Sequence, residues 1–241
     1  MQGSLALVGS GEFLPEMAEF EASLINDGMN NGKRAIYVQI PTAAGQESRE
    51  RLRYWEDLGR KQADLLQVEH RFLPIFTRED ADKKEFVNQL EDAALIYMSG
   101  GDPHYLSNTL RESPTWEAIE RNFRFGSSLA GCSAGAMVLS SHIPNFRLTK
   151  SEPTQGLDLL PNARVIPHFD KFFRWIPSSA AKILMHAPDN VILLGIDELT
   201  AIVKRSGEKR WMVEGRAKVH ILQGLPKQEL QHGEMIQLDP V

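Results

Sequence analysis

The sequence has only one cysteine, Cys132, among 241 residues, so no disulfide can form within the chain. Such scarcity is typical of proteins that work in a reducing compartment. No apolar run approaches the roughly 20 residues of a membrane span. The N-terminus lacks the basic segment and the longer apolar stretch of a secretory signal. We therefore expect a cytoplasmic protein with no membrane partner.

Basic charge is also in short supply, with 27 Lys and Arg against 32 Asp and Glu and a formal net charge of −5. Nucleic-acid-binding domains carry a concentrated basic face, so no nucleic-acid partner is expected. Histidine and cysteine do not occur at metal-ligand spacing. Gly9-Ser10-Gly11 hints at a dinucleotide site, but Leu14 stands in place of the third glycine. We predict neither a metal nor a cofactor.

What the sequence does contain is an alternation of strand-like and helix-like patterns. Apolar strand-like runs occupy residues 5–8, 35–40, 72–76, 94–98, 127–132, 165–166 and 191–196. Helical spacing occupies residues 15–25, 48–66, 77–90 and 114–125. This alternation predicts a mainly parallel, flavodoxin-like α/β sheet with helices on both faces. We expect one α/β domain over residues 1–241.

Two segments depart from this alternation. Short strand-like runs after residue 201 predict an antiparallel meander that closes the sheet, at residues 202–203, 211–213 and 219–222. The poorly patterned segment 141–161 predicts a long loop over the site.

The most informative motif is Gly131-Cys132-Ser133-Ala134-Gly135, where a strand should end and a helix begin. This Gly-x-Ser-x-Gly pattern is typical of a nucleophile elbow, a tight turn whose flanking residues must be small. It holds a hydroxyl at the edge of a sheet, as acyl transfer requires. In this register Ser133 is the nucleophile, and Cys132 should point into the core as a small apolar residue.

A serine hydroxyl needs a base to accept its proton. Among the seven histidines, His168 stands out, because it follows the strand-like Val165-Ile166-Pro167 and begins a turn. His142 is too close to Ser133 along the chain to face it easily. The other five lie in patterns typical of solvated faces or edges: His70, His104, His186, His220 and His232. His168 is therefore the candidate base.

The base in turn needs an orienting carboxylate, and the residues alone leave four candidates: Glu198, Asp197, Asp170 and Glu152. Asp197 and Glu198 follow a buried strand-like run, so either should emerge at the functional edge of the sheet. Ser133, His168 and the turn Gly100-Gly101 also follow strands, and we expect all of them to meet at one sheet edge.

The oxyanion of an acyl-transfer intermediate needs two preorganised donors. The backbone N–H of Ala134, at a helix N-terminus, is one candidate. An amide of Gly100-Gly101 is the natural second, because glycine lets the backbone approach a ligand closely.

Four motifs together resemble peptidase family S51, which includes aspartyl dipeptidases and cyanophycinases. They are, in chain order, Tyr97-Met98-Ser99-Gly100-Gly101-Asp102, Gly131-Cys132-Ser133-Ala134-Gly135-Ala136, Ile166-Pro167-His168-Phe169 and Gly195-Ile196-Asp197-Glu198. The resemblance implies a fold like class I glutamine amidotransferases, with serine where those enzymes place cysteine. It also implies a Ser133-His168-Glu198 triad and an oxyanion hole formed by the amides of Gly101 and Ala134.

The substrate is where the sequence departs from parts of that family. Cyanophycinases resemble each other in an Asp-Gln before the histidine and several arginines after it, whereas Ile166-Pro167 precede His168 here. Pro167-His168-Phe169 is closer to the dipeptidase pattern. Candidate substrate contacts are Gly100, Asp102 and Arg174, and Lys171 and Lys182 are further candidates for reading an N-terminal aspartate.

We therefore predict a serine peptidase that cleaves a small peptide or an isopeptide amide through an acyl-enzyme. Two alternatives stay open: a non-catalytic binding or regulatory domain on the same scaffold, and an amidohydrolase or esterase for a non-peptide substrate. Phe172, Phe173 and Trp175 are predicted to form a homodimer contact, a substrate pocket or ordinary core packing.

Overall fold

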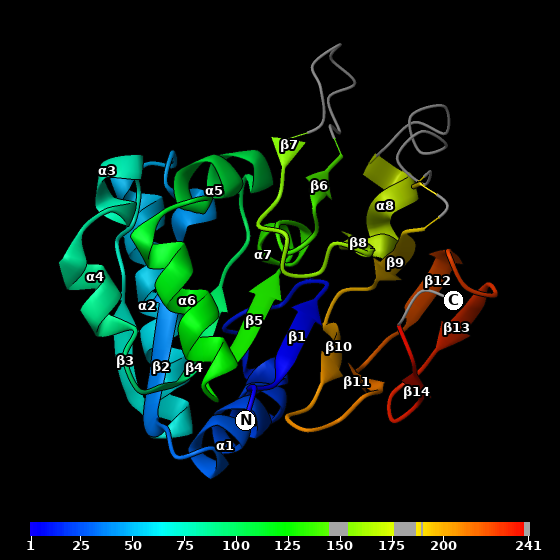
Figure 1. The fold of residues 1–241 in the computed structure, drawn as a ribbon, viewed down its shortest axis with the longest axis horizontal. Coiled ribbons are helices and arrows are strands. Elements are labelled where there is room, and N and C mark those ends of the chain that lie inside the picture. Colours follow the sequence, from blue (N-terminus) through cyan, green and yellow to red (C-terminus); the bar gives the residue numbers. More distant parts are fainter. Residues whose placement is uncertain (145–153, 176–186, 189, 239–241) are drawn as a thin grey trace.

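The computed structural model describes residues 1–144, 154–175, 187–188 and 190–238, with the exception of the side chains of residues 173–175. Two main sheets organise the chain (Figure 1). A short hairpin of β6 (His142–Ile143) and β7 (Thr154–Gln155) adds a third, two-stranded sheet.

The larger sheet has eight strands in the order β14-β11-β10-β1-β5-β4-β2-β3. Five of them run parallel: β1 (Leu5–Val8), β2 (Arg34–Ile40), β3 (Glu69–Phe72), β4 (Ala93–Met98) and β5 (Ser128–Cys132). Three antiparallel strands extend it beyond β1: β10 (Thr200–Lys204), β11 (Trp211–Gly215) and β14 (Met235–Ile236).

The smaller sheet has four strands in the order β13-β12-β9-β8. They are β8 (Ala163–Ile166), β9 (Ile192–Ile196), β12 (Val219–Gln223) and β13 (Gln228–Leu230). The β8–β9 pair is parallel and the other pairs are antiparallel. Figure 1 shows this sheet next to the β10–β11 end of the larger one.

Helices cover both faces of the larger sheet, and side chains alternate between the two faces along each strand. Tyr37 and Tyr97 pack with α1 (Ala18–Asn30) and α2 (Arg49–Leu66), whereas Val38 and Ile96 pack on the opposite face. That opposite face is covered by α3 (Arg78–Ala81), α4 (Lys84–Gln89), α5 (Pro103–Leu110), α6 (Pro114–Arg124) and α7 (Ala134–Met137). The remaining helical segments are η1 (Pro15–Met17), η2 (Thr42–Ala44) and α8 (Phe169–Trp175).

The predicted α/β architecture is confirmed, with local differences. The third strand lies at residues 69–72 rather than 72–76, and the helix expected over 77–90 is two short helices. Segment 141–161 contains the β6–β7 hairpin, with residues 145–153 outside the described part.

The C-terminal strands are antiparallel, as predicted, but they do not form one meander. After Gly215, with φ of 121°, the chain leaves β11, and β12 pairs with β9 of the smaller sheet. A strand pattern shows which side chains are buried but not which sheet edge the strand joins.

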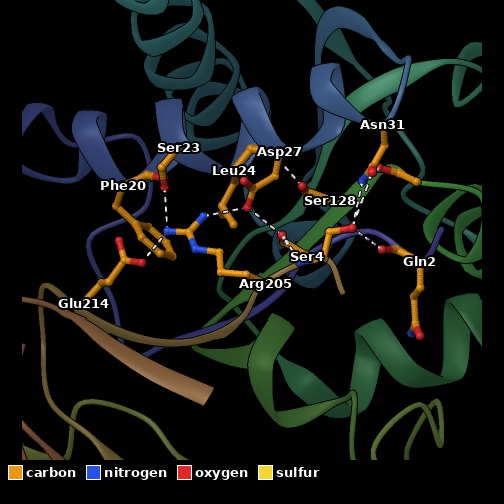
Figure 2. Close-up of polar contacts among 12 residues, drawn as sticks. Gln2, Ser4, Phe20, Ser23, Leu24, Asp27, Asn31, Ser128, Arg205 and Glu214 are labelled. Atoms are coloured by element: carbon orange, nitrogen blue, oxygen red, sulfur yellow. Dashed lines mark hydrogen bonds and ion pairs between the residues drawn. The ribbon is translucent and has the colours of Figure 1, made fainter. Parts of the chain in front are cut away.

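One ion-pair network ties this antiparallel extension to the parallel part of the sheet (Figure 2). Arg205, directly after β10, contacts Asp27 Oδ2 at 2.8 Å and donates to Ser23 Oγ at 2.8 Å, both on α1. It also pairs with Glu214 of β11. Asp27 accepts a further hydrogen bond from Ser4 Oγ at 2.6 Å, just before β1. The position of β1 is thereby fixed relative to β10 and α1.

A second polar group is buried completely between α1 and the sheet. The Glu21 carboxylate accepts hydrogen bonds from Tyr37 Oη and Gln62 Nε2, both at 3.0 Å, and from the Phe13 backbone N–H at 3.3 Å. Burial raises the pKa of Glu21 to about 7, and these hydrogen bonds only partly oppose it.

This raised pKa predicts a pH-dependent stability. The folded protein holds the Glu21 proton more tightly than the unfolded chain does, so the stabilisation is complete below about pH 4.5 and is lost as the pH rises through about 7. Glu21→Gln is neutral at every pH and should lack that loss. The free energy of unfolding of Glu21→Gln minus that of the wild type should therefore be about 2 kcal/mol higher at pH 8 than at pH 5. Urea denaturation at both pH values measures it, and a pH-independent difference would contradict the assignment.

Candidate active site

Ser133 lies in a strained turn between β5 and α7. Its φ of 51° and ψ of −110° are unusual for a residue with a side chain. A Cβ added at Gly131 would lie 2.3 Å from the Gly135 carbonyl oxygen, and one added at Gly135 would lie 2.2 Å from that of Met98. The predicted need for small residues around the serine is therefore confirmed.

The structure brings Ser133, His168 and Glu198 together in one hydrogen-bonded series. Ser133 Oγ is 3.0 Å from His168 Nε2, and His168 Nδ1 is 2.9 Å from Glu198 Oε1. His168 and Leu199, which follows Glu198, also have positive φ angles, of 50° and 52°. Backbone strain thus accumulates at the point where the three side chains meet.

The sequence analysis expected these three residues to meet at the edge of a single sheet. That expectation is wrong, because they follow strands of two different sheets. Ser133 follows β5 of the larger sheet, whereas His168 follows β8 and Glu198 follows β9 of the smaller one. The sequence pattern could not show that the strands belong to two sheets. Their carboxyl ends converge because β9 packs against β10 and β8 packs against α7, the helix that follows Ser133.

Three of the four candidate carboxylates lie in the described part of the chain, and among these Glu198 contacts His168. Asp197 instead accepts from the Lys218 backbone N–H at 3.1 Å and contacts His220 Nε2 at 3.0 Å. Asp170 Oδ1 accepts the Glu198 backbone N–H at 3.0 Å. Glu152 lies outside the described residues.

Lys171, one helical turn after His168 on α8, donates to Glu198 Oε2. Partial burial by itself would raise the pKa of Glu198. The hydrogen bonds from Lys171 and His168, together with their charges, outweigh that effect and hold the pKa of Glu198 below its usual value. The sequence suggested Lys171 as a cation that reads the substrate, but here its ammonium pairs with Glu198.

The glycine turn after β4 lies directly against the serine. A Cβ added at Gly100 would be 3.3 Å from Ser133 Cβ and 3.7 Å from its Oγ. Gly101 has φ of 139°, and a Cβ there would lie 2.4 Å from the Ala43 carbonyl oxygen. Gly101 therefore requires glycine, and a side chain at Gly100 would crowd Ser133 and Glu12.

The backbone N–H groups of Gly101 and of Ala134, the first residue of α7, have no hydrogen-bond acceptor within the described part of the chain. The neighbours of Gly101 are engaged, since the Gly100 N–H donates to Glu12 Oε1 and the Asp102 N–H to the Ala43 carbonyl. Two free donors near a nucleophile are what an oxyanion requires.

Asp102 has a local structural partner. Its Oδ1 accepts from the backbone N–H groups of His104 at 2.8 Å and Tyr105 at 3.0 Å, which caps the N-terminus of α5. Arg174 belongs to α8, but its side chain lies outside the described part, as does all of Lys182. Phe172 is buried with Ile166 and Leu193, so it packs in the core.

One residue of the site was missed by the sequence reasoning. Glu12, buried in the loop after β1, accepts from the Gly100 N–H at 2.8 Å, and Cys132 Sγ lies 2.9 Å from its other oxygen. Cys132 is buried as predicted, and burial together with Glu12 raises the pKa of its thiol well above the usual value. Gly9-Ser10-Gly11 in the sequence marks a tight turn after β1, but it does not single out Glu12.

Over the residues that the structure describes, no group of three or more His, Cys, Asp and Glu side chains is arranged to hold a metal ion. None of the described helices has the length and apolar character needed to cross a membrane.

A hydroxyl, an imidazole and a carboxylate in series, beside two free N–H donors, have the geometry of a serine hydrolase site. Residues 5–212 match the sequence model of Peptidase family S51, and the chain therefore belongs to this family of hydrolases.

Similar proteins agree with this assignment. The chain is 30% identical to cyanophycinase from Geminocystis herdmanii, over 87% of this chain and 77% of that one. It is 33% identical to cyanophycinase from Synechococcus elongatus, of which it spans 59%.

Solved structures extend the comparison. The crystal structure of a peptidase from an acI-B1 Actinobacterium is 62% identical, with a TM-score of 0.95 over 98% of this chain and 97% of that one. A putative peptidase E protein from Listeria monocytogenes EGD-e, 19% identical with a TM-score of 0.61 over 90% of this chain and 100% of that one, shares the fold.

Proposed function

We propose that the protein is a serine peptidase in which Ser133, His168 and Glu198 form the catalytic triad. The observation that carries this proposal is the unbroken series from Ser133 Oγ through His168 to Glu198, with contacts of 3.0 and 2.9 Å. A binding domain would have no need of a strained serine aimed at an imidazole, so the geometry favours catalysis over the non-catalytic alternative.

In the first half-reaction Ser133 Oγ attacks the scissile carbonyl and its proton passes to His168 Nε2. Glu198 at Nδ1 fixes the imidazole tautomer and stabilises the imidazolium. The amides of Gly101 and Ala134 receive the oxyanion. His168 then protonates the leaving amine, and the acyl-enzyme forms on Ser133. Water, deprotonated by His168, releases the acyl group.

For the substrate we propose a small peptide or an isopeptide amide. The dipeptidase-like Pro167-His168-Phe169 supports this choice, while the similarity to cyanophycinases makes cyanophycin a further substrate to test. A screen of N-terminal aspartyl dipeptides, β-aspartyl dipeptides and simple esters separates these substrates from the esterase alternative. We also propose that this takes place in the cytoplasm.

Removing the Ser133 hydroxyl tests the proposal. With the best substrate of that screen, Ser133→Ala should lower kcat by about 10³-fold or more, because only binding and the oxyanion donors remain. Ser140→Ala is the matched control, since Ser140 is a buried serine a few residues further on that donates to the Met137 carbonyl. Its kcat should stay within about threefold of the wild type. Retained turnover in Ser133→Ala would refute the mechanism.

The Lys171 contact predicts a shifted pH profile. Without its ammonium, Glu198 loses one of the charges that hold its pKa low and ionises at a higher pH. Because a protonated Glu198 no longer orients the imidazole, the acid limb of kcat/KM in Lys171→Met should move to higher pH.

Lys171→Arg keeps the charge and should retain the wild-type profile. The exposed Lys61 of α2 supplies the matched control, and Lys61→Met should leave the acid limb in place. An acid limb that moves to lower pH in Lys171→Met, or does not move, would show that Lys171 does not act through Glu198.

A further inference from the structure

The loop that follows β1 touches both halves of the site. The Gly9 N–H donates to the Thr200 carbonyl at 2.9 Å, and a Cβ added at Gly9 would lie 2.1 Å from the Asp197 carbonyl oxygen. The loop therefore packs against the chain on either side of Glu198. Gly11, with φ of 97°, turns the next residue, Glu12, back under the glycine turn and the elbow.

Glu12 contacts both of the segments that flank the reacting centre. One carboxylate oxygen accepts the Gly100 N–H at 2.8 Å, and the other lies 2.9 Å from Cys132 Sγ. A Cβ added at Gly100 would meet Glu12 Oε1 at 2.8 Å on one side and Ser133 Cβ at 3.3 Å on the other. The carboxylate is thus one residue away from the nucleophile and one residue away from Gly101.

The hydrogen bond to Gly100 determines which amide of the turn is left free. The Ser99 N–H donates to the Ile40 carbonyl, the Gly100 N–H to Glu12 and the Asp102 N–H to the Ala43 carbonyl. In the described structure the Gly101 N–H is the one left without an acceptor in this turn. Rotation of the peptide that precedes Gly100 would change the conformation of the turn and the direction of the Gly101 N–H.

A role in packing alone is a poor explanation for Glu12. A buried carboxylate loses its hydration, which costs several kcal/mol unless hydrogen bonds replace it. An apolar side chain of similar size would fill the space without that cost. What an apolar side chain cannot supply is an acceptor for the Gly100 N–H.

We propose that Glu12 is a positioning residue, whose carboxylate oxygen holds the Gly100 peptide so that the Gly101 N–H is aimed at the oxyanion formed by Ser133. This role rests on the proposed function. It acts on the transition state rather than on the bound substrate, since the oxyanion develops only during attack.

The test separates the reach of the side chain from its charge. Glu12→Gln keeps an acceptor oxygen at the same distance, and its kcat should stay within about threefold of the wild type. Glu12→Asp keeps the charge but withdraws it by one methylene, and Glu12→Ala removes both. In these two variants kcat should fall by about tenfold to a hundredfold with KM within about threefold, because loss of an oxyanion donor itself costs about 10² to 10³ in kcat.

Glu21→Gln is the matched control, since Glu21 is another buried carboxylate, whose hydrogen-bond donors are Tyr37, Gln62 and the Phe13 N–H and not Gly100 or Cys132. Its kcat at the same pH should be unchanged. Thermal unfolding of each variant identifies the folded ones, and if Glu12→Ala does not fold, the comparison of Glu12→Asp with Glu12→Gln decides.

The inference is overturned if Glu12→Asp retains wild-type kcat, if KM rather than kcat changes, or if Glu12→Gln is as impaired as Glu12→Asp. Ser133→Ala, assayed beside them, distinguishes the two levels of the account. If Ser133→Ala loses activity while the Glu12 variants keep theirs, only the positioning role is refuted. If Ser133→Ala keeps full activity, the proposed function itself is refuted.

Discussion

The hydrogen bond between Ser133 Oγ and His168 Nε2 is the contact on which the site depends, because it joins two sheets. Ser133, the proposed nucleophile, is carried by the larger sheet, and His168 and Glu198 by the smaller one. A 3.0 Å contact across that junction requires the two sheets to be held in a fixed position relative to each other. The loop after β1 contributes to this, since it packs against the end of β9 and against the elbow, and the Arg205 network fixes β1 relative to β10 and α1 (Figure 2).

Strain and buried charge gather at this junction. Ser133, His168 and Leu199 all have positive φ angles, and Glu12 is a buried carboxylate. Each costs free energy, which the surrounding packing and hydrogen bonds must offset. Neither Lys171 nor Glu12 takes part in the proposed chemistry directly. Lys171 pairs with Glu198, and Glu12 accepts a hydrogen bond from the glycine turn. In the proposed mechanism, the oxyanion donors and the base are thus fixed before substrate arrives, as electrostatic preorganisation requires.

Much of this site was predictable from sequence because its signals are local. A Gly-x-Ser-x-Gly turn after a strand specifies Ser133, and strand ends specify His168 and the Asp197-Glu198 pair. The choice of Glu198 over Asp197 came from family resemblance, because neighbouring residues at a strand end are equivalent until the turn is built. Glu12 could not be found this way. It depends on a contact between residues 12 and 100, and no periodicity encodes that pairing. The division of the C-terminal strands between two sheets escaped prediction for the same reason.

The most direct measurement of the central claim is peptide mapping by mass spectrometry after incubation with a fluorophosphonate. The account predicts one phosphonyl group per chain, attached to Ser133 and not to the neighbouring Cys132, whose thiol is buried against Glu12. Labelling should vanish when the imidazole is removed in His168→Ala. An adduct on Cys132, or an unlabelled Ser133 in folded protein, would contradict the account.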